Sequence, residues 1–164
     1  MNTHTALLTA LFAGVIAVGA AAAQADEGEH VGAGKVGIST IEAPAAIGPY
    51  SQAIRVGRTV YVSGEIGKDP MTGQFTGPSI GDQTDQALKN VAAILAAAGL
   101  TLDNVVATTV YLLDVNDFAG MNAAYASFFT KPFPARATIQ VAALPTKGAL
   151  VEISAIAVRV TDSE

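Results

Sequence analysis

Apolar residues recur every three or four positions in two segments of the chain, which is the period of an α-helix. The first segment runs from Asp82 to Ala98. Ser79 or Asp82 can cap its start, and Gly99 can adopt the left-handed conformation that ends many helices. The second segment runs from Asp117 to Phe129 and is followed by a proline that cannot continue it. The pattern therefore predicts two helices.

Other segments are rich in Val, Ile, Thr and Tyr, which is typical of strands. The predicted strands are Ala53–Val56, Thr59–Ile66, Val105–Leu113, Ala135–Ala142 and Leu150–Val160. Gly57-Arg58 can form a two-residue hairpin turn between the first two, and Pro145 to Gly148 can turn between the last two. The resulting order, ββαβαββ, predicts an α+β fold in which a mixed β-sheet carries both helices on one face.

The last predicted strand is apolar on both of its faces. One face would present Val151, Ile153, Ala155 and Ala157, and the other Leu150, Glu152, Ser154, Ile156 and Val158. Only one face can lie under the helices, so the other needs a different cover. We expect a second copy of the chain to supply it, which predicts an oligomer.

The first 25 residues resemble a secretory signal sequence. The stretch from Ala6 to Ala23 has no charge and is apolar apart from Thr9, and Ala23-Gln24-Ala25 is a small-x-small cleavage site. The alternative is a membrane anchor, because a stretch of this length can just span a bilayer. Cleavage predicts an exported protein, periplasmic or secreted, with a flexible leader over residues 26–37, a domain over 38–160 and a tail over 161–164.

Composition excludes several kinds of site. The chain has no cysteine and two histidines, of which His4 lies in the signal segment and His30 in the leader. Thiolate chemistry, cysteine or histidine metal sites and a Ser-His-Asp triad are therefore excluded from the predicted domain. No metal or other cofactor is expected. The net charge of −5 lies entirely after Ala25 and argues against a nucleic-acid partner.

Arg136 and Glu152 are isolated charges on the last two predicted strands. If these strands pair across the intervening turn in an antiparallel register of even sum, both side chains project from the same face. Two interpretations are open. One is a structural ion pair, and the other is an arginine that binds a carboxylate beside a glutamate that orients water. Asn122, on the apolar stripe of the second helix, needs a hydrogen-bond partner, which can be structural or a ligand.

Several segments resemble, in order, the Rid (YjgF-type) family of reactive-intermediate imine and enamine deaminases. They are Ala43-Pro44-Ala45-Ala46-Ile47-Gly48-Pro49-Tyr50-Ser51-Gln52-Ala53, Val62-Ser63-Gly64, Asn90-Val91, Ala97-Ala98-Gly99-Leu100, Asn116-Asp117-Phe118, Asn122-Ala123-Ala124-Tyr125, Phe133-Pro134-Ala135-Arg136 and Val151-Glu152-Ile153. The last two segments are the most specific. The resemblance extends over residues 38–159, nearly the whole predicted domain.

The resemblance implies a chorismate-mutase-like fold, assembled as a homotrimer with a site in each cleft between subunits. It implies hydrolysis of 2-iminopropanoate, 2-iminobutanoate and their enamine tautomers to 2-oxo acids and ammonia, without a cofactor. Arg136 would hold the substrate carboxylate and Glu152 would position the water. The implied pocket residues are Tyr50, Ser63, Asn122 and the backbone of Thr138. The alternative is a trimer that binds a small carboxylate in the same cleft without turnover, and neither reading involves nucleic acid or lasting membrane association.

Overall fold

A computed structural model of the protein describes residues 34–160. The predicted signal sequence, residues 26–33 of the predicted leader and the predicted tail lie outside this range. Within residues 34–160, no helix is long and apolar enough to cross a membrane.

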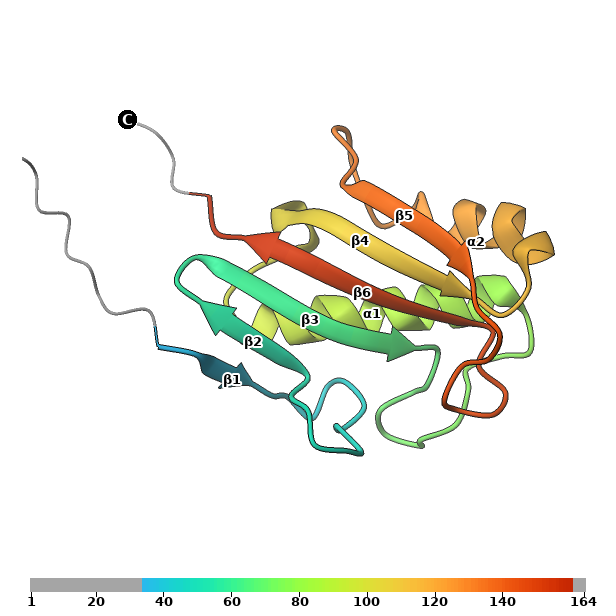
Figure 1. Ribbon diagram of the computed structural model, residues 1–164, viewed down its shortest axis with the longest axis horizontal. Helices are drawn as coiled ribbons and strands as arrows, with labels where there is room; N and C mark the ends of the chain where they lie inside the picture. Colours follow the sequence, from blue (N-terminus) through green and yellow to red (C-terminus); the bar gives the residue numbers. More distant parts are fainter. Residues whose placement is uncertain (1–33, 161–164) are drawn as a thin grey trace, which may run out of the picture. The chain divides into compact units, whose positions relative to one another are not determined.

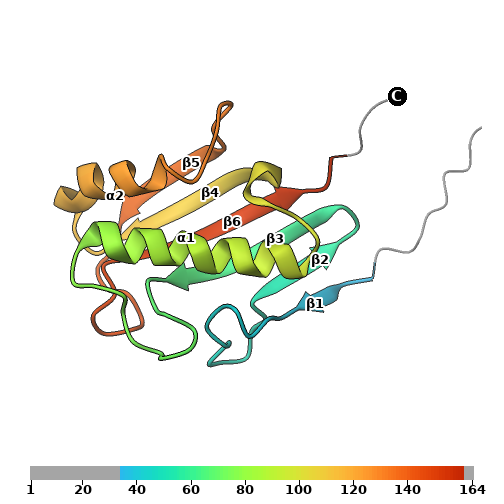
Figure 2. The same ribbon diagram turned by 180° about the vertical axis from the view of Figure 1, so that it is seen from behind.

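The described residues form one mixed sheet of six strands in the order β1-β2-β3-β6-β4-β5 (Figure 1). The strands are β1 (Val36–Ile38), β2 (Ala53–Val56), β3 (Thr59–Ile66), β4 (Val105–Leu112), β5 (Ala135–Gln140) and β6 (Val151–Val158). The helices α1 (Ile80–Ala97) and α2 (Phe118–Tyr125) lie on the same face of this sheet, as Figure 2 shows from behind. The predicted α+β architecture is confirmed.

Helix α1 forms as its sequence pattern predicts. The Ser79 hydroxyl accepts a hydrogen bond from the backbone N–H of Asp82 at 3.1 Å, which caps the first turn. Gly99 follows the helix with φ of +72°, a conformation that a side chain would disfavour. The buried stripe of α1, centred on Leu88, Val91 and Ile94, packs against the sheet and joins the buried strand residues in the core.

Helix α2 is shorter than predicted. It ends at Tyr125, and the chain continues in tight turns in which Phe128 N–H donates to the Tyr125 carbonyl. These turns still carry Phe129 into the core, where it is 8% exposed. The apolar period therefore marked burial correctly but not the end of the helix.

The predicted boundary between leader and domain is wrong by two residues. Val36 and Gly37 belong to β1, which pairs antiparallel with β2 through Val36↔Arg55 and Gly37↔Ile54. An edge strand is held by backbone hydrogen bonds, which glycine makes as well as other residues. The Gly-rich composition therefore concealed this strand.

The predicted pairing of the last two strands is also wrong. β6 lies between β3 and β4 and is antiparallel to both, whereas β5 lies at the sheet edge and is parallel to β4. Helix α2 connects β4 to β5, and such a helical crossover is what parallel neighbours require. The loop after β5 instead leads the chain past β4 into the centre of the sheet.

The two faces of β6 have different surroundings. Val151, Ile153, Ala155 and Ala157 are buried beneath the helices, and the residues between them lie on the opposite, open face. Large apolar side chains of this open face remain exposed: Tyr61 by 49%, Ile139 by 48% and Ile156 by 37%. The helices thus cover one apolar face and leave the other uncovered.

Candidate active site

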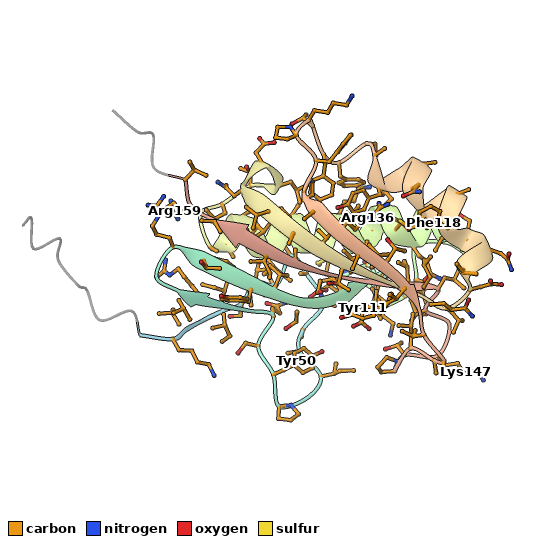
Figure 3. The ribbon with its side chains drawn as sticks, turned by 45° about the horizontal axis from the view of Figure 1, so that its top comes forward. Tyr50, Tyr111, Phe118, Arg136, Lys147 and Arg159 are labelled. Atoms are coloured by element: carbon orange, nitrogen blue, oxygen red, sulfur yellow. The ribbon has the colours of Figure 1, made fainter. Side chains whose placement is uncertain are left out.

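Arg136 projects from β5 toward α2. Its register partner on β4 is Thr108, which is 4% exposed and whose hydroxyl lies 2.8 Å from the Tyr125 hydroxyl. Neighbouring residues at the same register point to the same face of a sheet, so Arg136 lies on the helix side. Figure 3 shows it next to Phe118, beside α2.

Two contacts orient the guanidinium of Arg136. Its Nη2 donates to Oδ1 of Asn122 at 2.6 Å. Its central carbon lies 4.6 Å from the centre of the Tyr125 ring and 5.9 Å from that of Phe118, within the range of a cation–π interaction. A planar guanidinium held in this way keeps further N–H donors free for a ligand.

Arg136, Asn122 and Tyr125 line a cavity of about 400 Å³, which we call the Arg136 pocket. Its lining residues are Asn122, Tyr125, Ala126, Phe133, Pro134 and Arg136. Arg136 itself is exposed to solvent, so its charge does not need an ionic partner to offset burial. Thr138 is on the same strand and face as Arg136, but within the described chain it lines neither this pocket nor the one described next.

Glu152 lies on the other side of the sheet. Its neighbours on β6, Val151 and Ile153, both point into the core beneath the helices, so Glu152 points to the open face. The prediction that Arg136 and Glu152 project from the same face of adjacent strands is therefore wrong. It failed because β4 separates β5 from β6.

Glu152 lines a second cavity, of about 420 Å³, which we call the Glu152 pocket. Its lining residues are Pro44, Ala45, Ile47, Tyr50, Ser63, Gly64, Glu65, Ile66, Lys68, Pro145, Thr146 and Glu152. The predicted site residues thus fall into two groups. Tyr50 and Ser63 accompany Glu152, whereas Asn122 accompanies Arg136.

The Glu152 carboxyl is partly withdrawn from water, and this burial raises its pKa above the usual value. It lies directly against Gly64, where a Cβ atom would overlap the carboxyl group. The register between β3 and β6 shifts between Val62 and Glu65, which marks an irregularity in the ladder at this point. A bulge beside a glycine is a common way to aim a side chain into a site.

Gln52 shapes the wall of the Glu152 pocket, although sequence reasoning did not select it. It is 3% exposed, and its amide nitrogen donates to the carbonyls of Ala43 and Pro44 at 3.2 and 2.8 Å. The chain around Pro44 is thereby tied to the start of β2. Ser63, one of the predicted pocket residues, donates from its hydroxyl to the Ser51 carbonyl at 2.7 Å and so fixes the other side of this loop.

Glu65 and Lys68 also line the Glu152 pocket and were not predicted. Glu65 is 5% exposed, and its pKa is raised to about 8, chiefly by burial and secondarily by the charge of Glu152. At neutral pH this side chain is therefore largely an uncharged acid. A charged residue inside the apolar strand Thr59–Ile66 was the available signal for it.

The structure thus presents an α+β protein with an oriented arginine in one pocket and a partly buried carboxyl in another, a combination suited to a small anionic ligand. A family model described as endoribonuclease L-PSP matches residues 40–159. The chain belongs to this family, which also contains the Rid (YjgF-type) proteins that its motifs resemble.

Relatives with known sequence and structure agree with this assignment. The human 2-iminobutanoate/2-iminopropanoate deaminase is 54% identical over 122 residues, which covers 74% of this chain and 88% of the human protein. The crystal structure of RidA from an Antarctic Psychrobacter is 47% identical, with a TM-score of 0.71 over 74% of this chain and 98% of that one. The crystal structure of E. coli TdcF with bound serine is 43% identical, with a TM-score of 0.73 over 77% and 100% of the two chains.

Proposed function

We propose that this protein hydrolyses short 2-imino and 2-enamino acids, such as 2-iminopropanoate and 2-iminobutanoate, to 2-oxo acids and ammonia. The structural observation that carries the proposal is the Arg136 guanidinium, held by Asn122 and Tyr125 with donors free for a carboxylate. The relatives named as 2-iminobutanoate/2-iminopropanoate deaminases, at 54 to 56% identity, support the same reaction.

Arg136 would bind the carboxylate that every such substrate carries next to its imine carbon. Two parallel N–H donors fit the two oxygens of a carboxylate, which a lysine cannot reproduce. The hydrogen bond to Asn122 and the contact with the Tyr125 ring fix the plane of the guanidinium before the substrate arrives. Less conformational freedom is then lost on binding.

Glu152 would accept the proton of the attacking water. Water adds to the carbon of the protonated imine, its proton passes to the Glu152 carboxylate, and a neutral carbinolamine forms. Glu152 then returns this proton to the amine nitrogen, which departs as ammonia, while the hydroxyl loses its own proton to solvent and becomes the carbonyl of the 2-oxo acid. An iminium carbon is already electrophilic, so orientation and one proton acceptor suffice.

We propose that the two pockets belong to one site only in a homotrimer. Arg136 lies on an edge strand and Glu152 on the opposite face of the same sheet, so one chain does not bring them together. In a closed symmetric ring, each cleft receives the Arg136 pocket of one subunit and the Glu152 pocket of the next. The exposed Tyr61, Ile139 and Ile156 of the open face supply apolar surface for such contacts.

A second candidate is binding of a small carboxylate without turnover. The observation in its favour is that the TdcF structure, 43% identical, contains serine, an amino acid with the same carboxylate. The RNA cleavage suggested by the description of the family model has less support, because the net charge of −5 disfavours a polyanionic partner.

A coupled assay separates these candidates. An amino-acid oxidase generates imines from alanine and 2-aminobutanoate, and ammonia release is followed with and without the purified protein. We expect the protein to accelerate release above the spontaneous rate. Saturable binding of the substrate carboxylate with an unchanged rate of ammonia release would establish the binding alternative instead.

We further propose that the protein is exported and that cleavage after Ala25 leaves a mature chain beginning at Asp26. The intact mass of protein recovered from the periplasm or the medium measures this directly. Full-length chain recovered in the membrane fraction would establish the anchor instead.

A further inference from the structure

We propose that Lys68 makes the site selective for imino acids whose side chain ends in a second carboxylate, such as 2-iminosuccinate. This inference rests on the deamination proposed above. It assigns to Lys68 the role of a specificity-determining residue, which contacts the substrate side chain and takes no part in the water attack.

Lys68 lies on the same side of the sheet as Glu152. Ile66 is the register partner of Glu152 and therefore points to the open face. Gly67 points the other way, since a Cβ on it would meet Gln83 of α1. The Lys68 N–H then donates to the Ile66 carbonyl at 2.8 Å in a tight turn, and beyond this turn Lys68 lines the Glu152 pocket together with Glu152.

The backbone and side chain of Lys68 are both held in place. Its carbonyl accepts a hydrogen bond at 2.9 Å from the amide of Asn90, a fully buried residue of α1. Lys68 also forms an isolated β-bridge with Phe75, and its Nζ lies 5.5 Å from the centre of the Phe75 ring. A cation positioned in this way on a rigid support is suited to selecting a ligand charge.

The charge of Lys68 has no ionic partner within residues 34–160, where the salt bridge found joins Lys89 to Asp85 at 2.6 Å. Its neighbours along the pocket wall are largely apolar, including Ile47 and Pro145. The cavity of about 420 Å³ falls in the range of sites that hold ligands well above the size of a three-carbon acid. The pocket therefore offers both space and a positive charge for a longer, anionic side chain.

The charges of the assembled site match a dicarboxylic imine. Arg136 takes the carboxylate next to the imine carbon, and Glu152 faces the water that attacks this carbon. Among the described residues that line the two pockets, Lys68 is then the remaining cation for the carboxylate at the end of the substrate side chain. Hydrolysis replaces the imine nitrogen by oxygen and leaves this second carboxylate unchanged, so Lys68 would bind substrate and product alike.

A simpler role for Lys68 is to stabilise the ionised form of Glu152, and the two roles predict different kinetics. Loss of the charge would slow every substrate equally if Lys68 acts through Glu152. It would slow the dicarboxylic substrate selectively if Lys68 binds the side chain. The ratio of kcat/KM for an aspartate-derived imine to kcat/KM for an alanine-derived imine therefore measures the proposed role alone.

The experiment compares Lys68→Met, Lys68→Arg and the control Lys89→Met on these two imines, each generated by an amino-acid oxidase. Lys68→Met should lower the ratio about tenfold, as expected for one charge-assisted contact. Lys68→Arg should largely keep it, and Lys89→Met should not change it. Thermal melts verify that each variant is folded, and Lys68→Gln, which also removes the charge, replaces Lys68→Met if that variant fails to fold.

An unchanged ratio in folded Lys68→Met overturns the inference, whether both rates fall together or neither falls. Wild-type protein that hydrolyses the alanine-derived imine but not the aspartate-derived one also overturns it, and leaves the deaminase proposal intact. Wild-type protein that hydrolyses neither imine removes the deaminase proposal, and this inference with it.

Discussion

The Arg136 pocket and the Glu152 pocket have similar volumes but differ in the charged groups that line them. The first is centred on an exposed cation that an amide and an aromatic ring hold in place. The second contains two carboxyl groups whose pKa values are raised by burial, and one unpaired lysine of the described chain. Binding an anion needs accessible donors, whereas accepting a proton near neutral pH needs partial burial. Within one chain these two environments are separate, and the proposed trimer would bring them together in one cleft.

The most direct test of the different roles of the two pockets is to replace one charged side chain in each. Arg136→Ala should lower kcat/KM roughly 10- to 100-fold through loss of a charge-assisted contact, and Arg136→Lys should recover only part of the loss. Glu152→Gln should lower kcat while leaving KM nearly unchanged, because the shape of the side chain is kept. Steady-state kinetics of the coupled assay, together with thermal melts, measure both. If the variants fold and keep full activity, Arg136 and Glu152 are not part of the active site.

Mixing the two impaired variants tests whether the pockets combine between subunits. In trimers assembled from equal amounts of Arg136→Ala and Glu152→Gln chains, a cleft is intact when it draws Glu152 from the first and Arg136 from the second. Random assembly makes roughly a quarter of the clefts intact, so about a quarter of wild-type activity should return after co-refolding. Each variant refolded alone is the control. No recovery in mixed trimers, or a monomer by light scattering, would contradict a shared site.

Asn122→Ala tests how much the hydrogen bond between Arg136 and Asn122 contributes to substrate binding. The substitution removes the hydrogen bond at 2.6 Å but leaves the Tyr125 ring, so the guanidinium stays in place with less restraint on its plane. We expect KM to rise about fivefold, within the range for one charged hydrogen bond, with a smaller change in kcat. Ser127→Ala, on the turn after the same helix, is a matched control. A loss of thermal stability without a kinetic effect would make Asn122 purely structural.

The burial of Glu65 in the Glu152 pocket can be tested through the pH dependence of the melting temperature. Its pKa is raised from 4.5 to about 8 in the folded protein, so folding favours its protonated form. The resulting stability is fully present below pH 4.5 and is lost as the pH rises through about 8. Glu65→Gln, which cannot ionise, should therefore gain roughly 5 °C or more in Tm relative to wild type between about pH 5 and pH 9. The exposed Glu42→Gln is the control, and parallel Tm profiles would show that Glu65 does not titrate as described.

The elements of the fold were more predictable than their arrangement. Helix α1 has an apolar stripe, a serine cap and a left-handed glycine, and these local signals act within a few residues of one another. The pairing of β5 is decided by the crossover through α2, and the sequence alone suggested a hairpin instead. Because that one pairing was wrong, Arg136 and Glu152 were placed on one face when they lie on two.

Those residues of the candidate site that stand out in their local sequence could be predicted. Arg136 and Glu152 stand out as isolated charges on apolar strands, and family motifs led to Tyr50, Ser63 and Asn122. Gln52 and Lys68 were missed because their importance comes from what they contact across the fold. Gln52 spans from β2 to the chain around Pro44, and Lys68 is held by Asn90 of α1. Contacts of this kind have no local pattern.

Gly64 affects how sequence differences between this protein and its homologues should be interpreted. The volume that a side chain at this position would fill is taken by the Glu152 carboxyl group. A change as small as Gly64→Ala would therefore displace the proposed proton acceptor while Arg136 and Glu152 stayed in the sequence. A homologue that retains the arginine and the glutamate but carries a bulkier residue at this position would pass a motif search and still lack the chemistry. The lack of a side chain at Gly64 is therefore as useful for predicting activity in a homologue as the presence of Arg136 and Glu152.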